Sequence, residues 1–152
     1  MIIITVGLAF APIPSASRDL PVDVIAWFKG CVALVQGDTS AADVMDIQCV
    51  ADATDYCGIG RVEEDRGPCV EELAQELDTI TAALIANKPD VSSLTGFGPR
   101  SFELHWNLAE QKDHAHACTG ALRPPERCAA YTAMRRWKSA RTAWRTWRRY
   151  QP

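Results

Sequence analysis

The chain has 152 residues, 47% of them hydrophobic and 23% charged, which suffices for one domain with its own core and excludes a disordered or fibrous protein. No apolar run reaches the ~18 residues of a membrane-crossing helix, so the sequence predicts no spanning segment. The formal net charge of −3 combines two unlike halves, because residues 1–78 carry 14 acidic against 4 basic side chains and residues 79–152 carry 5 against 12.

The N-terminal residues 1–13 are apolar, and small residues follow at 15–17. This pattern is typical of a secretory signal peptide, although the usual basic residues at its start are missing. The alternative is a buried β-branched strand, which would need a sheet that the rest of the sequence does not indicate. We therefore expect residues 1–16 to be a signal peptide or N-terminal leader, followed by a single helical domain over residues 17–152.

Two helices are expected next. The first has Pro21 in its first turn and ends at Gly37, since proline suits a helix start and glycine a helix end. The second begins at Ser40, which forms a capping-box-like pair with Asp43, and continues to Gly58. Its expected buried face comprises Val44, Ile47, Val50 and Ala51.

After an expected loop from Gly58 to Gly67, three more helices are predicted. One opens at Gly67–Pro68 and ends before Pro89, one begins at Pro99, and the last covers residues 126–149. The fourth helix should bury Phe102, Trp106 and Ala109, and the last should bury Ala130, Ala133, Trp137, Ala140, Trp144 and Trp147. No two segments alternate as paired strands would, so the sequence predicts an all-α bundle of four to five helices.

Six cysteines are present: Cys31, Cys49, Cys57, Cys69, Cys118 and Cys128. An even number behind a candidate signal peptide indicates a disulfide framework, and therefore a periplasmic or secreted protein. The 15 pairings that six cysteines allow stay open, although Cys118 and Cys128 flank a turn and are the first candidate pair. The alternative is a reduced cytosolic protein with buried thiols.

Residues 52–78 are strongly acidic and could dock a basic partner. The predicted partner-binding residues are Asp55, Glu63, Glu64, Asp65, Glu71 and Glu72. The alternative for this segment is a solubilising surface, or an internal partner for the basic tail.

The C-terminal tail, residues 135–150, combines arginine and tryptophan with no acidic residue. It could bind nucleic acid or an anionic membrane. This alternative would use Arg141, Trp144, Arg145, Arg148 and Arg149. The charge split favours another interpretation, in which the tail buries its tryptophans and its arginines lie against the acidic first half. Nucleic acid is therefore not the favoured partner.

Three histidines raise the question of a metal or catalytic site. His114, His116 and Cys118 alternate, with His105 nearby, but residues two apart on a helix point in different directions. The sequence contains no phosphate-binding glycine loop, serine elbow or zinc-protease motif. We expect no metal site, no cofactor and no enzymatic activity.

Together these residues resemble the lysozyme inhibitor LprI-like domain of exported bacterial proteins, over about Cys57 to Arg135. Cys57 and Cys69 enclose eleven residues, and Cys69 leads into a helix that carries Asp78. Trp106 then precedes Cys118, and Cys128 is followed by Thr132 and Arg135. The chain departs from the family pattern after Asp78, where Thr81, Ala82 and Ile85 replace the usual Leu-Asn and Tyr.

The resemblance implies an extracytoplasmic, non-enzymatic helical domain that binds and occludes a lysozyme-like glycosidase. Animal-type lysozymes are basic, so the acidic segment would be the docking side. An immunity-type protein that neutralises another periplasmic toxin is the alternative. The oligomeric state stays open.

Overall fold

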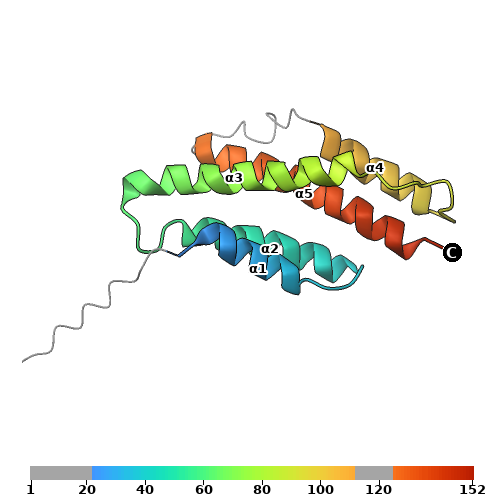
Figure 1. Ribbon diagram of the computed structural model, residues 1–152, viewed down its shortest axis with the longest axis horizontal. Helices are drawn as coiled ribbons and strands as arrows, with labels where there is room; N and C mark the ends of the chain where they lie inside the picture. Colours follow the sequence, from blue (N-terminus) through green and yellow to red (C-terminus); the bar gives the residue numbers. More distant parts are fainter. Residues whose placement is uncertain (1–21, 112–124) are drawn as a thin grey trace, which may run out of the picture.

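The computed structural model describes residues 22–111 and 125–152, which form five α-helices and no strand. The helices are α1 (Val24–Leu34), α2 (Ser40–Tyr56), α3 (Glu63–Ala86), α4 (Gly98–Glu110) and α5 (Pro125–Arg149) (Figure 1). The predicted all-α fold is thus confirmed, and Cys31–Cys49 and Cys57–Cys69 are two disulfides that brace it. None of these helices is long and apolar enough to cross a membrane.

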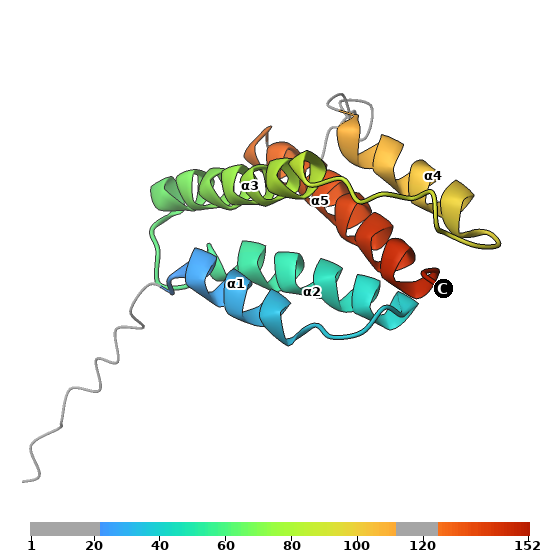
Figure 2. The same cartoon turned by 45° about the vertical axis from the view of Figure 1, so that its right-hand side comes forward.

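Helix α5 is the centre of the arrangement and contacts α2, α3 and α4. Helices α1 and α2 form a hairpin on one side of α3 and α5, and α4 lies on the other side of α5 (Figure 2). Helices α3 and α5 run parallel, since Asp78 contacts Arg136 and Leu84 further along contacts Trp144.

Two groups of buried side chains form the core. The larger one joins the hairpin to α3 and α5, and at its centre the rings of Phe28 and Trp137 meet edge to face with centroids 5.4 Å apart. The smaller one joins α4 to the second half of α5 through Phe102 and Trp106. The predicted apolar face of α4 is confirmed, since Phe102, Trp106 and Ala109 are all buried. That of α5 is confirmed for Ala130, Ala133, Trp137 and Ala140, whereas Trp144 and Trp147 are only partly buried.

The start of α1 is fixed by Asp23, whose carboxylate accepts a 2.9 Å hydrogen bond from the backbone N–H of Ala26. The capping box expected for α2 is wrong. Thr39 is the N-cap residue of α2, and the carboxylate of Asp43 instead accepts hydrogen bonds from Thr142 and Arg145 on α5. A tertiary ion pair therefore replaces the local cap.

The buried face predicted for α2 is also largely wrong. Val50 is buried, but Val44 is 65% exposed and Ala51 is exposed. The residues that α2 buries are Ala42, Asp46, Cys49, Val50 and Ala53. A disulfide at Cys49 and an ion pair at Asp46 set the rotation of the helix, and a hydrophobic pattern contains neither constraint.

Helix α3 begins at Glu63, so the predicted loop from Gly58 to Gly67 is too long and Pro68 lies inside the helix. Three acidic residues occupy the first turn, where the helix dipole favours negative charge. Pro68 lacks an N–H and leaves the carbonyl of Glu64 without its helical partner. This loss is confined to the second turn.

Two disulfides brace the first half of the chain. Cys31–Cys49 joins α1 to α2, and Cys57–Cys69 joins the end of α2 to α3. Cys128 is disulfide-bonded as well. The predicted Cys118–Cys128 pair cannot be described further, because Cys118 lies outside the described residues.

One glycine is required by close packing. Gly98 opens α4 against the C-terminal residues, and a Cβ there would lie 2.7 Å from the Cβ of Tyr150. Gly30, in the middle of α1, has no atom within 4 Å of the same position. The two glycines therefore differ in what an added methyl group would meet.

Candidate functional site

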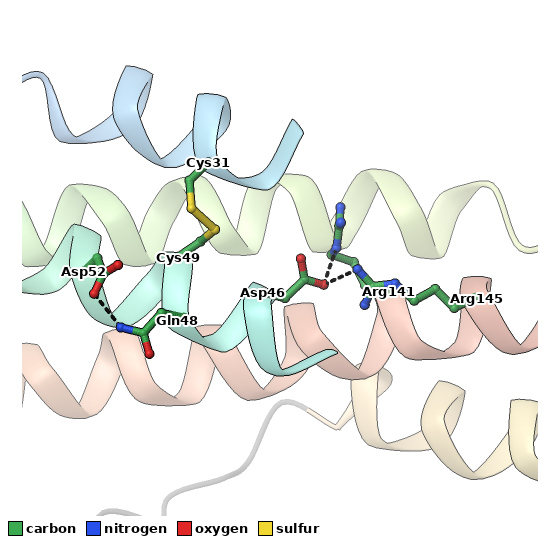
Figure 3. The surroundings of a disulfide bond; sticks show 7 residues. All are labelled: Cys31, Asp46, Gln48, Cys49, Asp52, Arg141 and Arg145. Atoms are coloured by element: carbon green, nitrogen blue, oxygen red, sulfur yellow. Dashed lines mark hydrogen bonds and ion pairs between the residues drawn. A yellow bond between two sulfur atoms is a disulfide. The ribbon is translucent and has the colours of Figure 1, made fainter. Parts of the chain in front are cut away.

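A row of ion pairs, here called the ionic ladder, joins the first half of α2 to the second half of α5. Its deepest member is Asp46, a fully buried carboxylate whose Oδ2 lies 2.7 Å from Arg141 Nε and 2.6 Å from Arg145 Nη2 (Figure 3). The ladder continues outward through Asp43–Arg145 at 2.7 Å and Asp38–Arg148 at 2.7 Å. Three carboxylates thus balance three guanidinium groups.

The aromatic residues of the tail are also engaged internally. Trp137 is buried, and Arg141 lies over its ring with the guanidinium carbon 5.1 Å from the centroid. The indole N–H of Trp144 donates to the carbonyl of Leu84, and that of Trp147 donates to the carbonyl of Asp90. Most arginines and tryptophans of the tail therefore contact other parts of the chain, which agrees with the interpretation of the tail as an internal helix and not with that of an anion-binding surface.

The predicted partner-binding residues, in contrast to the carboxylates of the ionic ladder, are mostly without an ion-pair partner among the described residues. Asp55, Glu63, Glu64, Asp65, Glu71 and Glu72 are all exposed, and we call this group the acidic end. Glu63 pairs with Arg66 at 3.4 Å, and the other five have no ion pair within residues 22–111 and 125–152. Residues 52–75 carry seven acidic side chains against two arginines, which leaves a formal charge of −5.

The acidic end lies where α2 ends and α3 begins, at one end of the molecule (Figure 1). Glu64 and Glu71 are seven residues apart and therefore share one face of α3. The Cys57–Cys69 disulfide fixes the connection between the two helices. Arg61 in this connection also donates a 2.9 Å hydrogen bond to the carbonyl of Val22, just before α1.

A groove of ≈ 460 Å³ opens between the second half of α2 and the first half of α5. Its lining residues are Ile47, Val50, Ala51, Thr54, Asp55, Arg127, Ala130, Tyr131 and Met134. The two helices run antiparallel and are joined by the ionic ladder at the other end, so the groove is the part of their interface that side chains leave unfilled. Asp55 belongs both to this groove and to the acidic end.

The histidine-rich motif gives no described site. His114, His116 and Cys118 lie outside the described residues, and within the described ranges no three His, Cys, Asp or Glu residues gather as metal ligands would. His105 is half-buried on α4, and this burial holds its pKa below the ordinary value, with a smaller lowering by Lys138 and an opposing effect of Asp43.

Sequence reasoning missed Asp38, Asp43 and Asp46 as structural partners of the tail. A signal was present in their spacing, because these residues and Arg141, Arg145 and Arg148 recur at intervals of three to five. On antiparallel helices, residues early in one row pair with residues late in the other. Asp38 accordingly pairs with Arg148, and Asp46 with Arg141. Hydrophobic periodicity alone does not contain this information.

Comparison of the chain with protein-family models, with curated proteins and with solved structures finds no match. The class of protein is therefore defined by its fold and surface, as a disulfide-braced helical bundle whose acidic end has a single ion pair among the described residues.

Proposed function

We propose that this chain is an exported, non-enzymatic binding protein that docks a basic protein partner on its acidic end. A lysozyme-like glycosidase is the candidate partner, and it comes from the resemblance to LprI-like domains. The two disulfides support an oxidising, extracytoplasmic location.

The observation that carries this proposal is that some acidic residues form ion pairs and others do not. The arginines of α5 neutralise Asp38, Asp43, Asp46 and Asp78, whereas five residues of the acidic end have no such partner within the described residues. Uncompensated surface charge steers the encounter with a partner of opposite charge. A binding surface is the role that best accounts for leaving this end charged.

The α2–α5 groove supplies the apolar part of the proposed interface. Its floor includes Val50 and Ala130, and the exposed Ala51 lies on its α2 wall. Interfaces commonly combine a buried apolar centre with a charged rim. We propose that an apolar side chain of the basic partner enters the groove while lysines or arginines pair with Asp55 and the start of α3.

The test is a turbidity assay of cell-wall lysis by a basic animal-type lysozyme, with the oxidised full chain in stoichiometric excess. Inhibition should disappear after reduction and alkylation, because the acidic end depends on a disulfide for its shape. Absence of inhibition and of binding by a folded, oxidised protein would refute the lysozyme assignment.

A matched pair of variants tests the surface. Neutralising two carboxylates with Glu64→Gln and Glu71→Gln should weaken binding roughly 2- to 30-fold and reduce its salt dependence. The control combines Ser93→Lys with Asn107→Lys, two exposed positions on other parts of the molecule that change the net charge by the same amount. Equal effects of the two variants would mean that only net charge matters and that the acidic end is not the docking surface.

A further inference from the structure

A second, smaller cavity of ≈ 210 Å³ lies between α3 and α5, and we call it the arginine pocket. It is lined by Leu84, Arg141, Trp144, Arg145 and Arg148. Every charged residue that lines it is an arginine. The carboxylates of the ionic ladder come from α2 and the turn before it, and none of them lines the pocket.

The guanidinium groups in this pocket have unused hydrogen-bond donors. A guanidinium carries five N–H donors, and Arg141 uses only its Nε, toward Asp46. Arg145 is 3% exposed, and its buried Nη2 forms no hydrogen bond in spite of its ion contact with Asp46. Arg148 directs Nε and Nη2 at a single oxygen of Asp38 and has Nη1 free.

A buried donor without a hydrogen-bond acceptor, such as Arg145 Nη2, is rare, and a bound ion or water is a common explanation for it. All three arginines line one small space, and Trp144 lines it with them. Tetrahedral oxyanions offer several acceptor oxygens at once and are the preferred ligands of clustered guanidinium groups.

We propose that the arginine pocket binds a single phosphate or sulfate group. This site is independent of the acidic end and of the proposed function. Because Asp38, Asp43 and Asp46 already balance the arginines, the group is held by directed N–H donors and not by excess charge. A dissociation constant of roughly 1 mM is therefore expected for inorganic phosphate.

Thermal unfolding of the full chain measures this binding. At ten times the dissociation constant, phosphate should raise Tm by about 3–6 °C above sodium chloride of equal ionic strength. Vesicles of phosphatidylglycerol, compared with phosphatidylcholine alone, test whether the group is instead part of a lipid headgroup. A rise in Tm with phosphate would indicate that the pocket binds the free ion. Binding to phosphatidylglycerol vesicles without such a rise would indicate that the ligand is a lipid headgroup.

Substitutions at Leu84 provide the decisive control. Leu84→Glu places a carboxylate among the arginines and should abolish both the Tm response to phosphate and the binding to vesicles. Leu84→Gln introduces a side chain of the same shape as glutamate without its charge and should keep whichever response the wild type shows. Leu84 uses only its backbone carbonyl to hold Trp144, so this contact survives in both variants. The proposal is overturned if Leu84→Glu responds like Leu84→Gln, or if the wild type responds to neither probe.

A second pair covers the case in which the Leu84 variants fail to fold. Arg148 is the most exposed of the three arginines, with a 48% exposed side chain, and Arg148→Gln should weaken the response several-fold. Arg149→Gln makes the same charge change at an exposed residue outside the pocket and should leave the response intact. Equal responses from these two variants would also overturn the proposal.

Discussion

Replacing Asp46 by asparagine tests whether the ionic ladder holds the hairpin on α5. The substitution keeps the size and shape of the side chain and removes one buried charge. Arg145, whose side chain is 4% exposed, would then lose one of its two carboxylate partners, and Arg141 would lose its only one. The energetic effect is therefore that of leaving buried positive charge uncompensated.

The magnitude follows from the burial of each partner. Removing one member of a buried ion pair typically lowers the free energy of unfolding by 3–5 kcal/mol. The side chain of Arg141 is 24% exposed and can regain some hydration, which places Asp46→Asn near the lower limit, about 3 kcal/mol. In a protein of this size such a loss lowers Tm by roughly 6–12 °C.

Denaturant unfolding of oxidised protein, followed by circular dichroism, gives the free energy directly. The matched control is Asp38→Asn at the solvent-exposed end of the ladder, where the side chains of Asp38 and Arg148 are 34% and 48% exposed. A loss of about 0–1 kcal/mol is expected there. If the two variants lost the same small amount of unfolding free energy, the buried part of the ladder would contribute no more than a surface ion pair, which contradicts the prediction.

Three further predictions concern single positions. Because burial lowers the pKa of His105 in the folded state, the unfolded chain binds the proton more tightly, so the free energy of unfolding should fall as the pH drops below about 6.5; His105→Gln should flatten this part of a pH series of denaturant titrations. Gly98→Ala should destabilise the fold by about 1–3 kcal/mol in thermal melts because of its close contact, whereas Gly30→Ala should stabilise it by about 0.5–1 kcal/mol, and equal shifts would contradict the packing argument. Replacing Cys57 and Cys69 together by serine should cost about 3 kcal/mol, measured against the wild type under oxidising conditions, and an unchanged midpoint would show that this disulfide does not constrain the unfolded chain.

The candidate surface could be predicted from the sequence only in part. The six predicted partner-binding residues are all exposed, as a docking surface requires, because carboxylates without partners stay in water. The groove that includes Asp55 and the pocket that includes Arg141 were not foreseen. The groove lies between α2 and α5 and the pocket between α3 and α5. Their size depends on the spacing of these helices, which is set by contacts between side chains distant in sequence.

The helical class, the buried face of α4 and most of that of α5 follow from the sequence alone, since Trp106, Trp137 and the alanines of α5 recur at helical intervals. The rotation of α2 and the partners of the tail arginines depend instead on tertiary contacts. The pairing of Asp46 with Arg145 spans 99 residues of chain, and its energy depends on the burial of both groups. Local periodicity reports which side chains avoid water, whereas long-range charge pairing decides which polar side chains can leave it.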